Sequence, residues 1–232
     1  MPTILAIETS TELASAALLL NGEVLAREAA GVQTHSRNLL PMVQAVLAEA
    51  GIALAQCDAI GFGAGPGSFT GVRTACGVAQ GLGFGADLPL VPIVTLEAMA
   101  ESCRAKTGAD NVLVLLDARM EEVYWAQYRF LDGWQAISAP RLGAASTVDV
   151  EGRVLACGNA LAAYASAFAD REFAAGARAD IMPHATFVAR LAQRAFLAGA
   201  TVAPRDASPI YLRDKVALTT AERALKAAGA SA

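Results

Sequence analysis

Residues 3–29, TILAIETSTELASAALLLNGEVLAREA, have a pattern typical of a small antiparallel sheet. The apolar segment Thr3–Thr9 predicts a short strand, and a polar turn separates it from a second apolar strand, Ala14–Leu20. The dipeptide Asn21-Gly22 predicts a two-residue hairpin, because both central positions of a type I′ turn need positive φ. Glu23–Ala29 then returns as a third strand. The segment therefore predicts a three-stranded β-meander.

The same pattern recurs in the second half of the chain. The strand Val112–Leu116 runs into Asp117, just as the first strand of the earlier meander ends at Glu8. After a short turn, Glu122–Phe130 forms the next strand, and Asp132-Gly133 predicts the hairpin that follows it. A meander that occurs twice, each time opening with a strand that ends in an acid, indicates an internal duplication.

Alternating strand and helix patterns follow each meander, and the second copy is the less regular one. After the first meander we predict helix Leu39–Ala50, strand Ala59–Gly63, helix Thr70–Leu82, strand Leu90–Val94 and helix Leu96–Lys106. After the second we predict strand Val154–Cys157 and helices near Ala160–Ala169, Phe187–Leu197 and Ala221–Ala228. Two βββαβα units describe an α/β fold with two actin-like (ASKHA, ribonuclease H-like) subdomains, whose mixed sheets are flanked by helices. We place them at residues 1–106 and 107–232, and we expect the last helix to pack back on the first subdomain.

Composition and charge exclude several classes of protein. No apolar stretch reaches the ~18 residues of a membrane span without a charge or a break, and no basic signal-peptide start is present, so we expect a cytoplasmic protein without membrane contact. The chain has 18 Lys and Arg against 22 Asp and Glu, and this balance disfavours binding of nucleic acid by the chain alone. Four cysteines are spaced too widely for a zinc site or a redox pair, and we expect buried free thiols: Cys57, Cys76, Cys103 and Cys157.

A glycine-rich connection, GFGAGPGSFTG at residues 61–71, lies between a predicted strand and a predicted helix. Its backbone amides, together with the helix N-terminus, could hold a phosphate. No Gly-Lys-Ser/Thr follows, so it is not a Walker loop, and a tight turn that packs the helix on the sheet is the alternative. We expect Glu8 and Asp117, at their strand ends, to face a cleft between the subdomains. The candidate nucleotide or phosphate residues are Glu8, Ser10, Thr11, Gly65, Gly67, Ser68, Thr70, Arg73 and Asp117.

The sequence argues against a complete catalytic site. An actin-like ATPase places a Gly-Gly pair after a strand of its second half, where the nucleotide base lies on bare backbone, and this chain has only Ala156-Cys157-Gly158-Asn159. Its two histidines, His35 and His184, lack the spacing of a metal-binding pair. Residues 65–71 depart from the Gly-x-Ser-x-Gly nucleophile elbow. We therefore predict no catalytic residue and no metal site. An active actin-like small-molecule kinase or ATPase is the alternative, and a peptidase has less support.

Two predicted helices have apolar or small-residue faces in excess of what one packed face requires. In the helix Leu39–Ala50, one apolar face is accompanied by a second face that is not polar, whereas an ordinary surface helix has a single apolar stripe. In the next helix, glycines four residues apart permit close backbone approach. Packing within the chain is the alternative to an interface. The candidate interface residues are His35, Leu39, Leu40, Met42, Val43, Val46, Leu47, Ala75, Gly77, Val78 and Gly81.

Several motifs together resemble the TsaB (YeaZ) family of tRNA threonylcarbamoyladenosine biosynthesis subunits. They occur in order over residues 3–130, with a weaker similarity at Tyr211-Leu212-Arg213. The motifs are Ile4-Leu5-Ala6-Ile7-Glu8-Thr9-Ser10-Thr11, His35-Ser36-Arg37-Asn38-Leu39-Leu40-Pro41, Gly65-Pro66-Gly67-Ser68-Phe69-Thr70-Gly71-Val72-Arg73 and Leu116-Asp117-Ala118-Arg119. Glu8 departs from the Asp that many relatives have at that position.

The resemblance implies a non-catalytic subunit that binds and supports TsaD. In that family TsaD transfers threonylcarbamoyl from threonylcarbamoyl-adenylate to N6 of the adenosine next to the anticodon, in tRNAs that read codons beginning with A. The resemblance also implies TsaE, an ATPase subunit, as a second partner, and a homodimer when the chain is alone. It implies contact with tRNA only through the complex. By the same resemblance the chain requires no cofactor of its own, and any ATP or ADP would bind at the partner interface.

Overall fold

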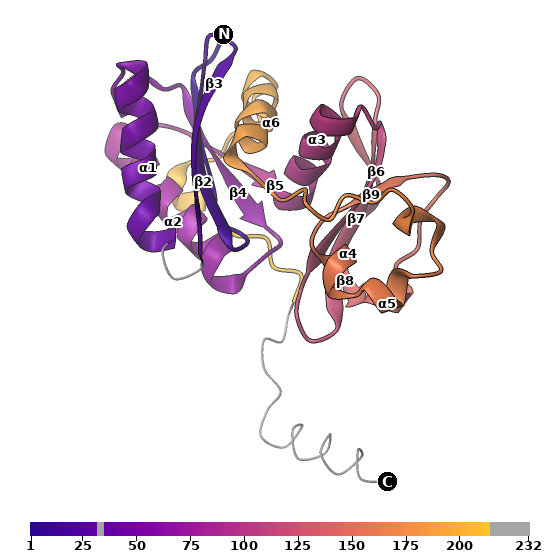
Figure 1. The fold of residues 1–232 in the computed structure, drawn as a ribbon. Coiled ribbons are helices and arrows are strands. Elements are labelled where there is room, and N and C mark those ends of the chain that lie inside the picture. Colours follow the sequence, from indigo (N-terminus) through magenta and orange to yellow (C-terminus); the bar gives the residue numbers. More distant parts are fainter. Residues whose placement is uncertain (32–34, 214–232) are drawn as a thin grey trace, which may run out of the picture.

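The computed structural model describes residues 1–31 and 35–213, and they form two lobes with one mixed sheet each (Figure 1). The first sheet has the order β3-β2-β1-β4-β5 and the second β8-β7-β6-β9. The strands of the first are β1 (Ile4–Glu8), β2 (Leu13–Leu20), β3 (Glu23–Ala30), β4 (Ala59–Gly65) and β5 (Leu90–Val94). Those of the second are β6 (Asn111–Asp117), β7 (Glu122–Phe130), β8 (Trp134–Ala144) and β9 (Leu155–Cys157).

The two sheets repeat one topology, which confirms the predicted duplication. In each, the opening strand, β1 or β6, is antiparallel to the next strand of its meander and parallel to a strand reached by a later crossover, β4 or β9. The predicted hairpin is also confirmed, with φ of 53° at Asn21 and 88° at Gly22. Local signals therefore predicted both meanders, because alternating burial and turn chemistry act over a few residues.

Helices cover both faces of the first sheet. Helices α1 (His35–Ala50) and α2 (Phe69–Ala86) pack on one face, with Leu5 and Ile7 of β1 in the shared core. Helix α6 (Ala185–Leu197) packs on the other face, against Ile4 of β1. Because side chains alternate along a strand, β1 supplies both cores and is buried throughout.

Helix α6 lies in the sequence of the expected second subdomain but belongs in space to the first lobe. Its apolar stripe packs on β1, β2, β4 and β5, and Val188, Leu191 and Ala192 are buried there. Gly61 of β4 permits the contact, because a Cβ at this position would lie 2.7 Å from the Cβ of Ala192. A boundary at residue 107 therefore assigns each sheet to one subdomain, but it assigns α6 to the second subdomain although this helix packs on the first sheet.

Helix α3 (Thr95–Thr107) lies between the lobes, where it packs on β6 and also contacts β4, β5 and α6. The predicted helix Ala160–Ala169 is wrong as a single element. It consists of two short helices, α4 (Ala160–Ala163) and α5 (Ala165–Phe168), which are separated at Tyr164, where φ is −124° and ψ is 38°. The Tyr164 hydroxyl donates a hydrogen bond to Asp117 Oδ1 at 2.7 Å, a distant contact that local sequence does not reveal.

The remaining boundaries differ from prediction by a few residues. Helix α1 begins at His35, helix α2 continues to Ala86, and strand β8 runs on to Ala144. All four cysteines are free and buried, as predicted. The predicted helix at Ala221–Ala228, with its expected packing on the first subdomain, lies outside the described residues. Within the described part of the chain, no helix has the length and apolarity needed to cross a membrane.

Candidate functional site

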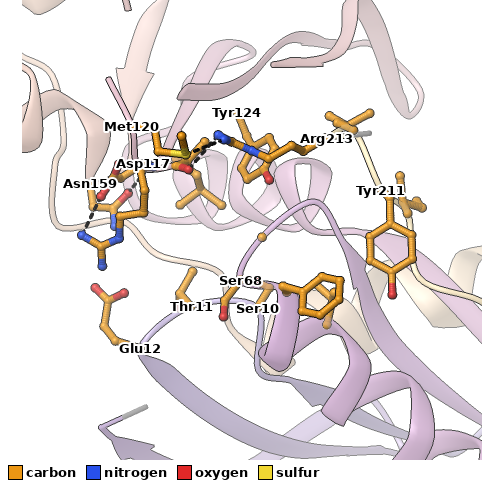
Figure 2. Close-up of a pocket in the computed structure, with 18 residues that line it drawn as sticks. Ser10, Thr11, Glu12, Ser68, Asp117, Met120, Tyr124, Asn159, Tyr211 and Arg213 are labelled. Atoms are coloured by element: carbon orange, nitrogen blue, oxygen red, sulfur yellow. Dashed lines mark hydrogen bonds and ion pairs between the residues drawn. The ribbon is translucent and has the colours of Figure 1, made fainter. Parts of the chain in front are cut away.

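A pocket of about 360 Å³ opens between the two lobes (Figure 2). The first lobe contributes the β1–β2 turn and the start of α2, and the second contributes the β6–β7 turn and Asn159, two residues after β9. The segment at residues 210–213 completes the wall. The lining residues are Ser10, Thr11, Glu12, Gly67, Ser68, Phe69, Val72, Leu116, Asp117, Ala118, Arg119, Met120, Tyr124, Asn159, Ile210, Tyr211, Leu212 and Arg213.

The structure brings together five of the nine predicted nucleotide or phosphate residues. Those that line the pocket are Ser10, Thr11, Gly67, Ser68 and Asp117. The other four, Glu8, Gly65, Thr70 and Arg73, do not line it. The end of β1 and the glycine-rich connection therefore meet at this pocket, although part of each faces elsewhere.

Close packing explains most of the glycine-rich connection. A Cβ at Gly67 would lie 2.6 Å from the Ser10 carbonyl oxygen, and a Cβ at Gly71 would lie 2.0 Å from the Thr9 carbonyl oxygen. The Ser68 amide donates a hydrogen bond to the Ser10 carbonyl at 2.7 Å, and Ser68 is also the N-cap of α2. These glycines thus allow the β1–β2 turn to rest on the first turn of α2.

Glu8 does not face the cleft, and that expectation is wrong. Its side chain is fully buried at the end of β1, where Oε1 accepts the Ser10 amide hydrogen at 2.6 Å and Oε2 accepts the Thr95 hydroxyl hydrogen at 3.3 Å. A Cβ at Gly63 would lie 1.9 Å from Oε2, so the neighbouring strand is open to receive the carboxyl group. Burial raises the pKa of Glu8, against the opposing effect of its hydrogen bonds.

Asp117 lines the pocket, but its carboxylate is engaged by neighbours. Oδ1 accepts hydrogen bonds from the Arg119 amide at 2.7 Å and from the Tyr164 hydroxyl at 2.7 Å, and Oδ2 forms an ion pair with Arg119 Nη1 at 2.9 Å. The Asp117 amide itself donates to Asn159 Oδ1 at 2.9 Å. The carboxylate therefore fixes the β6–β7 turn against Tyr164, and the Asp117 amide links the same turn to Asn159.

Arg73 also has partners within the chain. Its guanidinium carbon lies 3.7 Å from the centre of the Phe69 ring, and Nε donates to the Tyr211 hydroxyl at 2.7 Å. These contacts hold residues 210–213 against α2. The sequence analysis did not predict that this segment packs there. The single signal for it was the weak Tyr211-Leu212-Arg213 similarity. The wall residues Phe69, Met120 and Asn159 were missed as well.

Most predicted interface residues lie in the chain's own core. Those buried against the first sheet or at its edge are His35, Leu39, Met42, Val43, Val46 and Ala75, and Leu47 and Val78 are partly buried against the same core. The six buried residues are therefore not available on the surface of this chain, whereas Leu47 and Val78 remain partly exposed. Leu40 is an exception, with 44% of its surface exposed.

The outward surface of α2 is different, and we call Gly77, Gly81, Phe84 and Gly85 its glycine face. Each of the three glycines is exposed, and a Cβ built on it would have nothing within 4 Å. Phe84 is 83% exposed and lies on the same side of the helix, one turn from Gly81 and two turns from Gly77. Each glycine in a helix interior costs about 0.5–1 kcal/mol relative to alanine, and no contact within the described residues requires these three.

Comparison with known proteins places the chain in a family. A family model described as TsaD, tRNA N6-adenosine threonylcarbamoyltransferase, matches residues 23–220. The Haemophilus influenzae protein called tRNA threonylcarbamoyladenosine biosynthesis protein TsaB is 39% identical over 92% of this chain and 94% of its own length. The chain belongs to the TsaB (YeaZ) family. The TsaB of Escherichia coli is 37% identical, over 92% of this chain and 96% of its own length.

Solved structures agree with this TsaB assignment. The structure titled YeaZ from Pseudomonas aeruginosa has a TM-score of 0.85 at 37% identity and covers 91% of this chain and 100% of its own. A second Pseudomonas aeruginosa structure, of a protein described as similar to peptidase YEAZ, has a TM-score of 0.86. The predicted actin-like fold of the TsaB family is thereby confirmed. Among the residues that the structure describes, no cluster of His, Cys, Asp and Glu could hold a metal ion.

Proposed function

We propose that this chain acts in tRNA threonylcarbamoyladenosine biosynthesis as a non-catalytic subunit that binds and supports TsaD. The names of its relatives support the pathway. Within this proposal TsaD transfers the threonylcarbamoyl group, TsaE joins the complex as an ATPase subunit, and the chain works in the cytoplasm. The tRNA is bound through the complex, because the net charge of −4 on this chain disfavours binding of tRNA phosphates by the chain alone.

The observation that carries the partner role is the glycine face of α2. Small residues let the backbone of a second helix approach closely, and an exposed Phe84 beside them supplies an apolar anchor. Glycine costs this helix about 0.5–1 kcal/mol at each of three positions, and no contact within the described part of the chain compensates for it. Such a surface fits one that is covered in an assembly. A second copy of the chain could cover this surface when TsaD is absent, so we propose a homodimer for the isolated protein.

The cleft residues fit a metal-bound nucleotide poorly. Glu8 is buried behind the cleft, the Asp117 carboxylate is paired with Arg119, and Arg73 is held by Phe69 and Tyr211. Magnesium-bound nucleotides need free carboxylate or water ligands on the metal and donors for the phosphates. We therefore propose that the chain needs no cofactor, that ATP or ADP in the complex binds at the partner interface, and that the kinase alternative does not apply.

A binding experiment with matched variants tests the partner role. We expect Gly81→Arg to remain folded, because the glycine face points to solvent, and to lose its complex with TsaD in size exclusion with light scattering. A charged side chain at the centre of a buried contact is desolvated without a partner and also holds the backbones apart. Gly133→Arg is the control, because Gly133 is in the second lobe and a Cβ there also meets nothing within 4 Å.

The possible results for Gly81→Arg distinguish an interface at the glycine face from an interface elsewhere. Normal circular dichroism with no TsaD complex for Gly81→Arg, and full binding for Gly133→Arg, would support the proposal. A folded Gly81→Arg protein that binds TsaD as the parent does would place the interface elsewhere. Light scattering on the variant without TsaD shows in the same experiment whether the homodimer uses this face.

A further inference from the structure

The β6–β7 turn contains three consecutive residues in the left-handed region of backbone space. The φ angles are 63° at Arg119, 58° at Met120 and 65° at Glu121. None is a glycine, and L-residues avoid this region because Cβ comes too close to the following carbonyl oxygen. Such a run persists only where surrounding groups hold it in place, and strained segments of this kind concentrate at sites that switch or bind.

Contacts within the turn account for part of the restraint. The Asp117 carboxylate accepts the Arg119 amide hydrogen at 2.7 Å. The Ala118 amide donates to the Glu122 carbonyl at 3.0 Å, and the Glu122 amide donates to the Arg119 carbonyl at 3.1 Å. These bonds close the turn but do not bind its outer surface, where Met120 is 61% exposed.

Arg213, distant in sequence, contacts that outer surface. Its guanidinium lies 3.1 Å from Met120 Sδ (Figure 2) and donates to the Ala118 carbonyl at 3.0 Å. It also forms an ion pair with Glu122 at 2.6 Å. The Arg213 side chain is only 15% exposed. One planar cation thus contacts the residue before the left-handed run, one residue within it and the residue after it.

Arg213 ends a segment that crosses the cleft, and we call Ile210–Arg213 the strap. In the first lobe, the Ile210 amide donates to the Ala64 carbonyl at 2.7 Å and Tyr211 accepts from Arg73 at 2.7 Å. In the second lobe, Leu212 packs against the core of β6 and β7. The strap therefore connects the two lobes, and it forms one wall of the pocket.

We propose that the strap and the left-handed turn form one two-state latch across the cleft. With Arg213 docked, the turn is left-handed and Arg119 is held on Asp117 at the pocket wall. When Arg213 withdraws, the turn relaxes to ordinary backbone angles and the pocket loses that wall. A ligand or partner that binds one state must shift both elements together. The latch concerns this chain alone and is independent of the proposed TsaD interface.

A double-mutant cycle on melting temperature tests the latch. It measures how strongly position 120 prefers glycine to alanine, with and without the Arg213 side chain. Met120→Gly and Met120→Ala both remove the side chain and its sulfur contact, and they differ only in Cβ. With Arg213 present, we expect the glycine variant to melt about 2–4 °C above the alanine variant, because glycine adopts positive φ without strain. In an Arg213→Ala background the difference should vanish or reverse, because glycine then only adds entropy to the unfolded chain.

A proteolysis measurement reports the same transition directly. We expect trypsin to cut after Arg119 several-fold faster in Arg213→Ala, followed by mass spectrometry, because a released turn fits a protease more readily. Arg205→Ala is the control, because Arg205 is an exposed cation on the nearby 3₁₀ turn Pro204–Asp206 and should leave both readouts unchanged. Should Arg213→Ala fail to fold, Arg213→Lys, which keeps the positive charge but not the planar fork, replaces it. An unchanged glycine–alanine difference together with an unchanged cutting rate would overturn the latch.

Discussion

Two alanine substitutions in helix α2 should change the stability of the protein in opposite directions. Gly71 and Gly77 are both helical, but their surroundings differ completely. A Cβ at Gly71 would lie 2.0 Å from the Thr9 carbonyl oxygen, whereas a Cβ at Gly77 would meet nothing within 4 Å. The same chemical change therefore separates the intrinsic helix preference from tertiary packing.

The magnitudes follow from these contacts. An ordinary contact requires well over 3 Å, so Gly71→Ala must move α2 away from the β1–β2 turn by about 1 Å. Overpacking costs about 2–3 kcal/mol. The movement also strains the hydrogen bond that the Thr9 hydroxyl donates to the Gly71 carbonyl, at a cost of about 1 kcal/mol. Against these losses, alanine has a higher helix propensity than glycine, which contributes about 1 kcal/mol. The net loss is about 2–3 kcal/mol, or about 5–10 °C in melting temperature. Gly77→Ala should gain about 0.5–1 kcal/mol.

Urea unfolding followed by circular dichroism measures both values on the isolated chain. The difference between the two variants should be about 3 kcal/mol. Equal stabilities for Gly71→Ala and Gly77→Ala would refute the inference that Gly71 is required by close approach to the β1–β2 turn. A destabilised Gly77→Ala would show that the glycine face packs within the chain, and would also remove the argument for a partner there.

Four further predictions concern titration and activity. Burial raises the pKa of Glu8 above its ordinary 4.5, so ionisation destabilises the fold as pH rises, and Glu8→Gln should gain stability over the parent at pH 7 but little below pH 4.5 in urea titrations. Burial lowers the pKa of His184 below its ordinary 6.5, so stability should be lost as pH falls from 6.5 through that lowered pKa. His184→Asn, which keeps an N-cap acceptor for the Thr186 amide, should abolish that loss. The isolated chain should hydrolyse neither ATP nor peptides, and ATP hydrolysis that disappears on Asp117→Ala would contradict the non-catalytic role. It should also bind tRNA weakly at physiological salt, and sub-micromolar affinity in a filter-binding assay would contradict the charge argument.

Local sequence was sufficient for the two meanders and most of the helices. The Asn21-Gly22 turn and the apolar runs on either side act over a few residues, so their geometry follows from backbone preferences alone. The meander that occurs twice, each time opening with a strand that ends in an acid, predicted the duplicated fold. The motif set likewise pointed to the family that the comparisons show.

Only the tertiary structure decided which side of each element meets which neighbour. Glu8 and Asp117 occupy equivalent positions in sequence, yet one is sealed inside the first lobe and the other lines the pocket, because Gly63 leaves room beside Glu8. Gly71 and Gly77 belong to one helix, and only the position of the β1–β2 turn makes the first essential and the second exposed. The hydrogen bond from Arg213 to the β6–β7 turn joins segments more than ninety residues apart in the sequence. Such contacts depend on how distant segments pack, and local preferences carry no information about them.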